Sequence, residues 1–231
     1  LHSLIIVEKR KSLQAWVLLL SILAFLLSMV GTFLVRSGIL TSVHTFASDP
    51  SRGIYILLFA TLLGAYSLFL FGIKLKKDPN NNYLSFLSKE NSILINNILM
   101  VVVCFSVFLG TIYPLIIEAF TSNKISVGEP YYNTAVVPIM IPAILIMGIG
   151  PILAWGKVNK LEIFKKTYPC FIASLTMTIL TFIFYQSFSF GGVIGIFLAY
   201  WIIFNNTILW FRKKEKLSRG MLISHLGIGF L

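Results

Sequence analysis

Histidine is the residue type whose chemistry stands out in this sequence, because the chain has only three, His2, His44 and His225. A neutral imidazole ligates metal ions, relays protons, and donates and accepts hydrogen bonds. His2 comes six residues before the basic run EKRK begins at Glu8, and His225 comes six residues after Arg219, which ends a second basic run. Each therefore lies roughly 9 Å along its helix from a basic flank. We expect these two histidines at matching depth on the same side of a membrane.

Two imidazoles at equal depth on separate helices match the needs of a six-coordinate haem iron, which takes axial nitrogens from both faces of its ring. Ionisable groups inside lipid are costly and tend to mark function. A proton relay remains open, as does an interhelical hydrogen bond, worth about 0.6 kcal/mol on average. His44 differs because it lies in the polar stretch RSGILTSVHTFASDPSRG. For that residue, a surface hydrogen bond and iron ligation are both open.

Membrane helices are the elements that must position these residues. The chain is 57% hydrophobic and 12% charged with a mean hydropathy of +0.88, whereas charged residues make up about a quarter of a soluble domain. No apolar run alternates with polar residues as a barrel strand must, so the runs are helices. The sequence predicts an all-α polytopic bundle with six complete transmembrane helices. They are expected at 16–35, 54–73, 93–117, 134–155, 169–186 and 191–211.

We expect a single membrane domain over 1–231, with partial helices at 1–7 and 221–231. An outer-face platform at 36–53 joins the first two spans, and an outer loop covers 118–133. Because the chain begins with Leu1 rather than Met and ends inside an apolar run, we interpret it as a fragment. The prolines and glycines of PIMIPAILIMGIGP predict a broken or kinked helix.

The basic residues predict the orientation of the chain. Alternate connections between the helices hold all but three of the 19 Lys and Arg residues, and the positive-inside rule assigns such connections to the cytoplasmic side or its organellar equivalent. Segments 36–53 and 118–133 are then on the outer side. Helix flanks and anionic lipid headgroups account for the net charge of +11. We therefore expect the lipid bilayer, and no nucleic acid, as a partner.

Several motifs resemble the CcmF/NrfE family of haem-handling membrane proteins, the haem lyase components of cytochrome c maturation. The most specific is VGTFLVRSGILTSVHTFASDPSRG, which follows LHSLIIVEKRKSLQAW. Later motifs occur in the family's order: LGTIYPL, ISVGEPYYN, GIGPILAW and HLG. The resemblance covers essentially the whole chain.

The resemblance implies ligands for two haems. His2 and His225 would ligate a resident b-type haem, and His44 would be one of two outer histidines that hold the substrate haem delivered by the chaperone CcmE. The other outer histidine and the tryptophan-rich WWD segment would precede Leu1. The fragment would then carry three of the four ligands, and we expect it to be inactive alone.

The resemblance also implies an enzyme: a cytochrome c haem lyase of the bacterial or mitochondrial inner membrane. Apocytochrome c would supply CxxCH thiols that form thioether bonds to haem, the resident haem would act as reductant, and a CcmH-type thiol subunit would be a partner. Arg36 and Arg52 flank His44, and a guanidinium matches a haem propionate bidentately; snorkelling at helix ends is their alternative role. A membrane transporter, including one for haem, is the alternative function.

Overall fold

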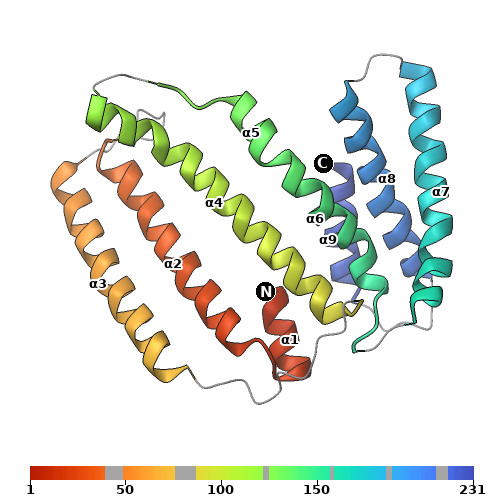
Figure 1. The fold of residues 1–231 in the computed structure, drawn as a ribbon, viewed down its shortest axis with the longest axis horizontal. Helices are drawn as coiled ribbons and strands as arrows, with labels where there is room; N and C mark the ends of the chain where they lie inside the picture. The colour runs from red at the N-terminus through yellow and green to blue at the C-terminus, as the bar shows by residue number, and fades with distance from the viewer. Residues whose placement is uncertain (40–48, 76–86, 122–124, 157–158, 186–188, 212–217) are drawn as a thin grey trace. The chain divides into compact units, whose positions relative to one another are not determined.

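A computed structural model describes residues 1–39, 49–75, 87–121, 125–156, 159–185, 189–211 and 218–231, and every regular element within them is helical (Figure 1). The chain divides into two compact units. The first comprises Leu1–Asn82 and Thr111–Ser126, and the second comprises Tyr83–Gly110 and Val127–Leu231. The expectation of a single membrane domain over 1–231 stays a prediction, because each unit is described by itself.

The first unit is built on a helical hairpin. Helix α1 (His2–Arg10) ends in a turn in which Lys11 and Leu13 adopt left-handed backbone angles, with φ of 54° and 63°. Helix α2 (Gln14–Arg36) then packs beside α3 (Pro50–Lys74) (Figure 1). The two helices approach closely where Gly64 lies, because a Cβ there would come within 2.9 Å of Leu26 Cδ2.

The second unit contains a bent helix pair. Helix α5 (Glu129–Ala135) and helix α6 (Val137–Ile149), which continues as the short 3₁₀ helix η1 (Gly150–Ile152), meet at a bend of 48°. Pro138 lies just beyond this break, and a proline has no N–H with which to continue a helical hydrogen-bond ladder. The predicted proline-rich break is therefore present, at the start of the cluster.

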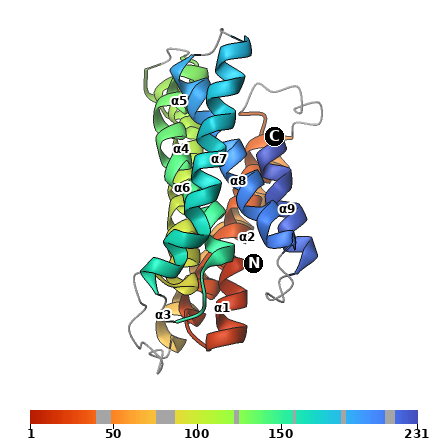
Figure 2. The same ribbon diagram turned by 90° about the vertical axis from the view of Figure 1, so that its right-hand side faces the viewer.

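Three further helices complete the core of the second unit. They are α7 (Lys160–Tyr185), α8 (Phe190–Phe211) and α9 (Arg219–Phe230), and α8 packs against α6, α7 and α9 (Figure 2). Trp201 of α8 is buried and donates its indole N–H to the Leu145 carbonyl of α6 at 3.1 Å. The indole occupies the space beside Gly148, where a Cβ would come within 2.3 Å of the indole Nε1.

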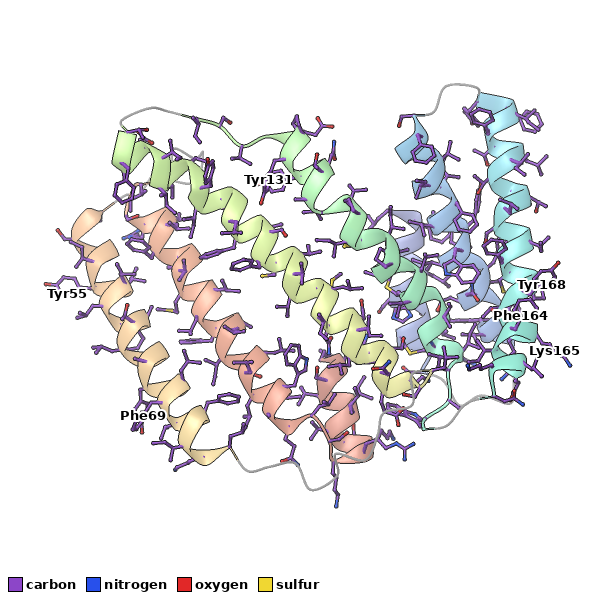
Figure 3. All side chains as sticks on the ribbon, viewed as in Figure 1. Tyr55, Phe69, Tyr131, Phe164, Lys165 and Tyr168 are labelled. Atoms are coloured by element: carbon purple, nitrogen blue, oxygen red, sulfur yellow. The ribbon has the colours of Figure 1, made fainter. Side chains whose placement is uncertain are left out.

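Apolar side chains cover the outside of the helices, as expected for a protein that faces lipid. Tyr55 and Phe69 of α3 are 72% and 63% exposed and extend away from the helix axis (Figure 3). Within the described residues, five helices are long and apolar enough to cross a membrane, and the bent pair makes a sixth. The predicted all-α polytopic bundle with six spans is thus confirmed when the bent pair is counted as one span.

Several helices extend beyond the apolar runs that predicted them. Helix α4 (Lys89–Thr121) begins before the expected 93–117, and α7 begins well before the expected 169–186. At the start of α7, the exposed Lys160 can extend to water while its stem covers apolar surface, so a charged turn continues the helix at little cost. At the start of α4, the carboxylate of Glu90 is instead buried against the Gly156 N–H. Both ends of the predicted outer loop 118–133 are helical as well, the first in α4 and the second in α5.

Candidate functional site

His225 lies on the face of α9 that packs against α8. Leu222, His225 and Gly229 recur at helical spacing along one stripe, and Leu222 and Gly229 are buried. The Nδ1 atom of His225 is buried, whereas the residue as a whole is only half-buried. The accessible surface of the residue therefore lies away from Nδ1.

Helices α8 and α9 pack closely along this stripe of α9. A Cβ on Gly229 would come within 2.8 Å of Ile203 Cγ1 and 3.2 Å of the Ala199 carbonyl oxygen. One end of the interface is apolar, because Leu222 belongs to a buried cluster with Leu209. Glycine at the crossing point lets the two backbones approach, as small residues do in membrane helix pairs.

His2 lies in the first unit, on α1, where it is exposed. The buried residues of this helix are Ser3 and Ile6, and α1 packs against α2. His2 and His225 thus belong to different units, each described by itself, and their pairing stays a prediction.

The two ends of segment 36–53, predicted to form an outer-face platform, are joined by backbone contacts. The Asp49 N–H donates to the Arg36 carbonyl at 2.9 Å. A Cβ on Gly53 would come within 2.9 Å of Ser37 Cα, so the first turn of α3 lies directly against the end of α2. His44, predicted to ligate substrate haem, lies outside the described residues.

The two platform arginines have different surroundings. The side chain of Arg52 pairs with Asp49 through Nε and Oδ2 at 3.1 Å, and is 69% exposed. Asp49 also caps α3, because its Oδ1 accepts the Arg52 backbone N–H at 3.2 Å. Arg36 is half-buried at the end of α2. The Nε group of Arg52 is therefore already paired with a carboxylate of the protein. The predicted contact with a haem propionate would need the other guanidinium nitrogens.

A histidine whose Nδ1 faces the protein is suited to ligate haem iron. Histidine imidazole is a common axial ligand of haem, and ligating histidines hold their second nitrogen against the protein. The buried Nδ1 of His225 and the accessible surface on the other side of the residue fit this arrangement. In the first unit, His2 offers the same donor chemistry from an exposed position.

Two features of the second unit were not predicted from the sequence. Asn205 and Asn206 are fully buried in the last two turns of α8, although adjacent asparagines in a membrane span signal a polar contact. Glu90 is 4% exposed, and both of its carboxylate oxygens lie 3.0 Å from the Gly156 N–H. The sequence around Glu90 is a charged connection and does not indicate burial. The group that Glu90 binds, the Gly156 N–H, lies 66 residues away in the sequence.

The relatives of this chain described below are all cytochrome c-type biogenesis proteins. A scan against models of protein families finds no match. CcmF of Escherichia coli, a cytochrome c-type biogenesis protein, is 38% identical over 241 residues, covering 99% of this chain and 36% of CcmF. NrfE of Haemophilus influenzae, also a cytochrome c-type biogenesis protein, is 34% identical over 243 residues, covering 100% of this chain and 37% of NrfE.

A solved structure described as cytochrome c heme lyase CcmF has the same fold. It matches 99% of this chain and 34% of its own chain with a TM-score of 0.68, at 20% identity. The present chain thus spans about a third of the length of the proteins it matches.

Proposed function

Because this chain belongs to the CcmF family of cytochrome c-type biogenesis proteins, we propose that it forms part of a haem lyase of cytochrome c maturation. The observation that carries the proposal is the 38% identity to Escherichia coli CcmF over 99% of the chain. The helical fold and its membrane-spanning lengths support it. The chain corresponds to 36% of the length of that relative. The proposed activity therefore belongs to a whole protein of this family.

We infer that substrate haem is held on the outer face by His44. The connections rich in Lys and Arg are then cytoplasmic, and the segment 36–53 is periplasmic in a bacterium. The contact between the two ends of this segment, where the Asp49 N–H donates to the Arg36 carbonyl, holds the start of α3 against the end of α2 and supports this position for the platform. The haem is delivered by the chaperone CcmE, and a CcmH-type subunit handles the thiols of apocytochrome c.

The reaction is the addition of two cysteine thiols across the two vinyl groups of haem. Each sulfur forms a bond to one vinyl carbon, and the thiol proton passes to the other carbon, so no net oxidation takes place. Histidine ligation fixes the orientation of the ring, and alignment of thiol and vinyl group then supplies much of the rate enhancement. Arg36 contributes a guanidinium at the platform for a haem propionate, and Arg52 contributes its Nη groups.

His2 and His225 are proposed as the axial ligands of a resident b-type haem. Their equal sequence distance from cytoplasmic basic flanks supports this pairing. When bound, the haem supplies an electron to the iron of the substrate haem. The role of the two side chains is to hold their iron-binding nitrogens in fixed positions, and the buried Nδ1 supports this role for His225.

A reduced-minus-oxidised visible spectrum of the full-length protein, purified without added haem, tests the proposal. We expect a b-type band that is lost in His2→Ala and in His225→Ala. His44→Ala is the matched control: the band stays, while the yield of cytochrome c in cells falls. A wild-type protein without haem, or a band unchanged in both membrane variants, would refute the assignment.

A further inference from the structure

Two lysines near the start of α7 have no partner in the part of the chain that the structure describes. Lys160 and Lys165 are both exposed, and neither ammonium group there forms an ion pair, a hydrogen bond or a contact with an aromatic ring. The other described basic residues of this unit each contact a carboxylate or a ring: Lys166 pairs with Glu162, Lys89 lies over Trp155, and Arg219 lies over Trp210.

The backbone at this end of α7 is already satisfied by Asn159. Its Oδ1 accepts the Leu161 N–H at 3.0 Å, and its carbonyl accepts the Glu162 N–H at 3.1 Å and the Ile163 N–H at 3.3 Å. An anion at this end would therefore be bound by the lysine side chains and not by the first turn of the helix.

An exposed pair of aromatic rings lies beside the two lysines. Phe164 and Tyr168 stack with their ring centroids 5.3 Å apart, and both residues are more than half exposed. At about 100° per residue, Phe164, Lys165 and Tyr168 fall within an arc of about 100° on the helix, and Figure 3 shows all three at the same end of α7. Lys160 comes one turn before Phe164, about 40° outside the arc. Tyrosine is enriched where a membrane helix passes from headgroups to acyl chains.

The same arc continues along α7 as exposed apolar surface. Ile172, Leu175 and Ile179 fall within it and are all exposed. The helix rises about 16 Å from Tyr168 to Ile179, which matches one half of a hydrocarbon core about 30 Å thick. The buried side chains of α7 lie outside the arc, and they are Cys170, Ser174 and Thr178.

A phospholipid with an anionic headgroup matches this surface along its whole length. Its phosphate oxygens accept hydrogen bonds from ammonium groups, and its acyl chain covers apolar side chains. The carboxylate of Glu162 does not cancel the charge of the two lysines, because it is paired with Lys166 at 3.0 Å. A zwitterionic headgroup carries its own cation beside the phosphate, so two unpaired lysines favour a headgroup with a net negative charge.

We propose that this face of α7 binds one anionic phospholipid, whose phosphate lies on Lys160 and Lys165 and whose acyl chain follows the apolar arc. The inference does not rest on haem binding or on the proposed reaction. It rests on α7 as a membrane span, for which the helix has the length and the composition. With the predicted orientation of the chain, the lipid belongs to the cytoplasmic leaflet.

Lipid binding to the full-length protein, measured by native mass spectrometry from detergent micelles, tests the proposal. Phosphatidylglycerol and phosphatidylcholine with the same acyl chains are added separately, and inorganic phosphate is added together with phosphatidylglycerol in a third series. The test variant combines Lys160→Gln with Lys165→Gln. The matched control combines Lys9→Gln with Lys11→Gln, which removes the same charge from two exposed lysines at the end of α1.

We expect the wild type to bind its first phosphatidylglycerol more tightly than its first phosphatidylcholine. The Lys160/Lys165 variant should lose about tenfold to thirtyfold in affinity for phosphatidylglycerol, while its affinity for phosphatidylcholine stays the same. The Lys9/Lys11 variant should bind both lipids as the wild type does. Inorganic phosphate should not displace the lipid, because it lacks the acyl chain that covers the apolar arc.

Four results would overturn the inference. Equal losses in the two double variants would indicate a general effect of net charge, and equal affinities of the wild type for the two lipids would remove the role of headgroup charge. An unchanged affinity in the Lys160/Lys165 variant would show that these lysines do not hold the phosphate, as expected where another part of the full-length protein covers this face. Displacement by inorganic phosphate would identify a free anion as the ligand. None of these results bears on the proposed function, which is read from the haem spectrum.

Discussion

Replacement of Gly148 by alanine should destabilise the second unit through a clash with Trp201. The new methyl group would lie 2.3 Å from the indole Nε1 and 2.7 Å from Cδ1, so the ring must move. Overpacking of this kind costs about 1–3 kcal/mol, and movement of the ring also weakens the bond to the Leu145 carbonyl, worth about 1 kcal/mol. Alanine returns up to about 1 kcal/mol as a better helix former. We expect a net loss of about 1–3 kcal/mol.

The assay is reversible unfolding of the full-length protein in mixed micelles, followed by tryptophan fluorescence and near-ultraviolet circular dichroism. A loss of 2 kcal/mol changes the folding equilibrium constant about thirtyfold, which such a titration resolves. Gly195→Ala is the matched control, because Gly195 lies inside α8 with no heavy atom within 4 Å of its virtual Cβ. This variant should be as stable as the wild type or more stable. If both alanine variants behave alike, α6 and α8 do not pack through the indole as described.

Substitutions at three further positions test other contacts by the same titration. Glu90→Leu should lower the free energy of unfolding by about 1.5–3 kcal/mol, because it removes a buried charged acceptor from the Gly156 N–H. Glu90→Gln keeps an acceptor and should cost less. Equal losses in the two variants would argue against the contact. Asp49→Ala should lower the free energy of unfolding by about 1 kcal/mol through loss of the α3 cap. Asp49→Asn keeps the cap and loses only the ion pair with Arg52. Equal stability of the two variants would contradict the capping role. Tyr131→Phe removes a hydroxyl that donates to a backbone carbonyl of α4 at 2.8 Å, for a loss of about 1 kcal/mol; no change in stability would place that hydroxyl in solvent.

The helices were the part of the fold best predicted from the sequence. An apolar run long enough to span lipid has one stable backbone structure, so composition alone located the spans. Helix ends were less well predicted, because Lys89 and Lys160 continue their helices as charged residues. The bend before Pro138 was predicted from proline chemistry, while its angle depends on packing.

The candidate site residues stay predictions, and the contacts around them did not follow from the sequence. His225 stood out because ionisable residues are rare in membrane spans. The burial of Asn206 depends on how α8 packs against its neighbours in the second unit, which no local pattern of residues indicates. Glu90 was missed because its acceptor role needs a backbone N–H from a remote part of the chain, which no local pattern indicates.

The bond between Asp49 and Arg36 joins the ends of α2 and α3 independently of the segment between them. The Asp49 nitrogen lies 2.9 Å from the Arg36 carbonyl oxygen, and Gly53 lies against Ser37. A change of loop length between fixed ends costs little, since each doubling adds only about 0.6 kcal/mol. Corresponding segments from relatives could therefore be grafted between α2 and α3 without repacking either helix.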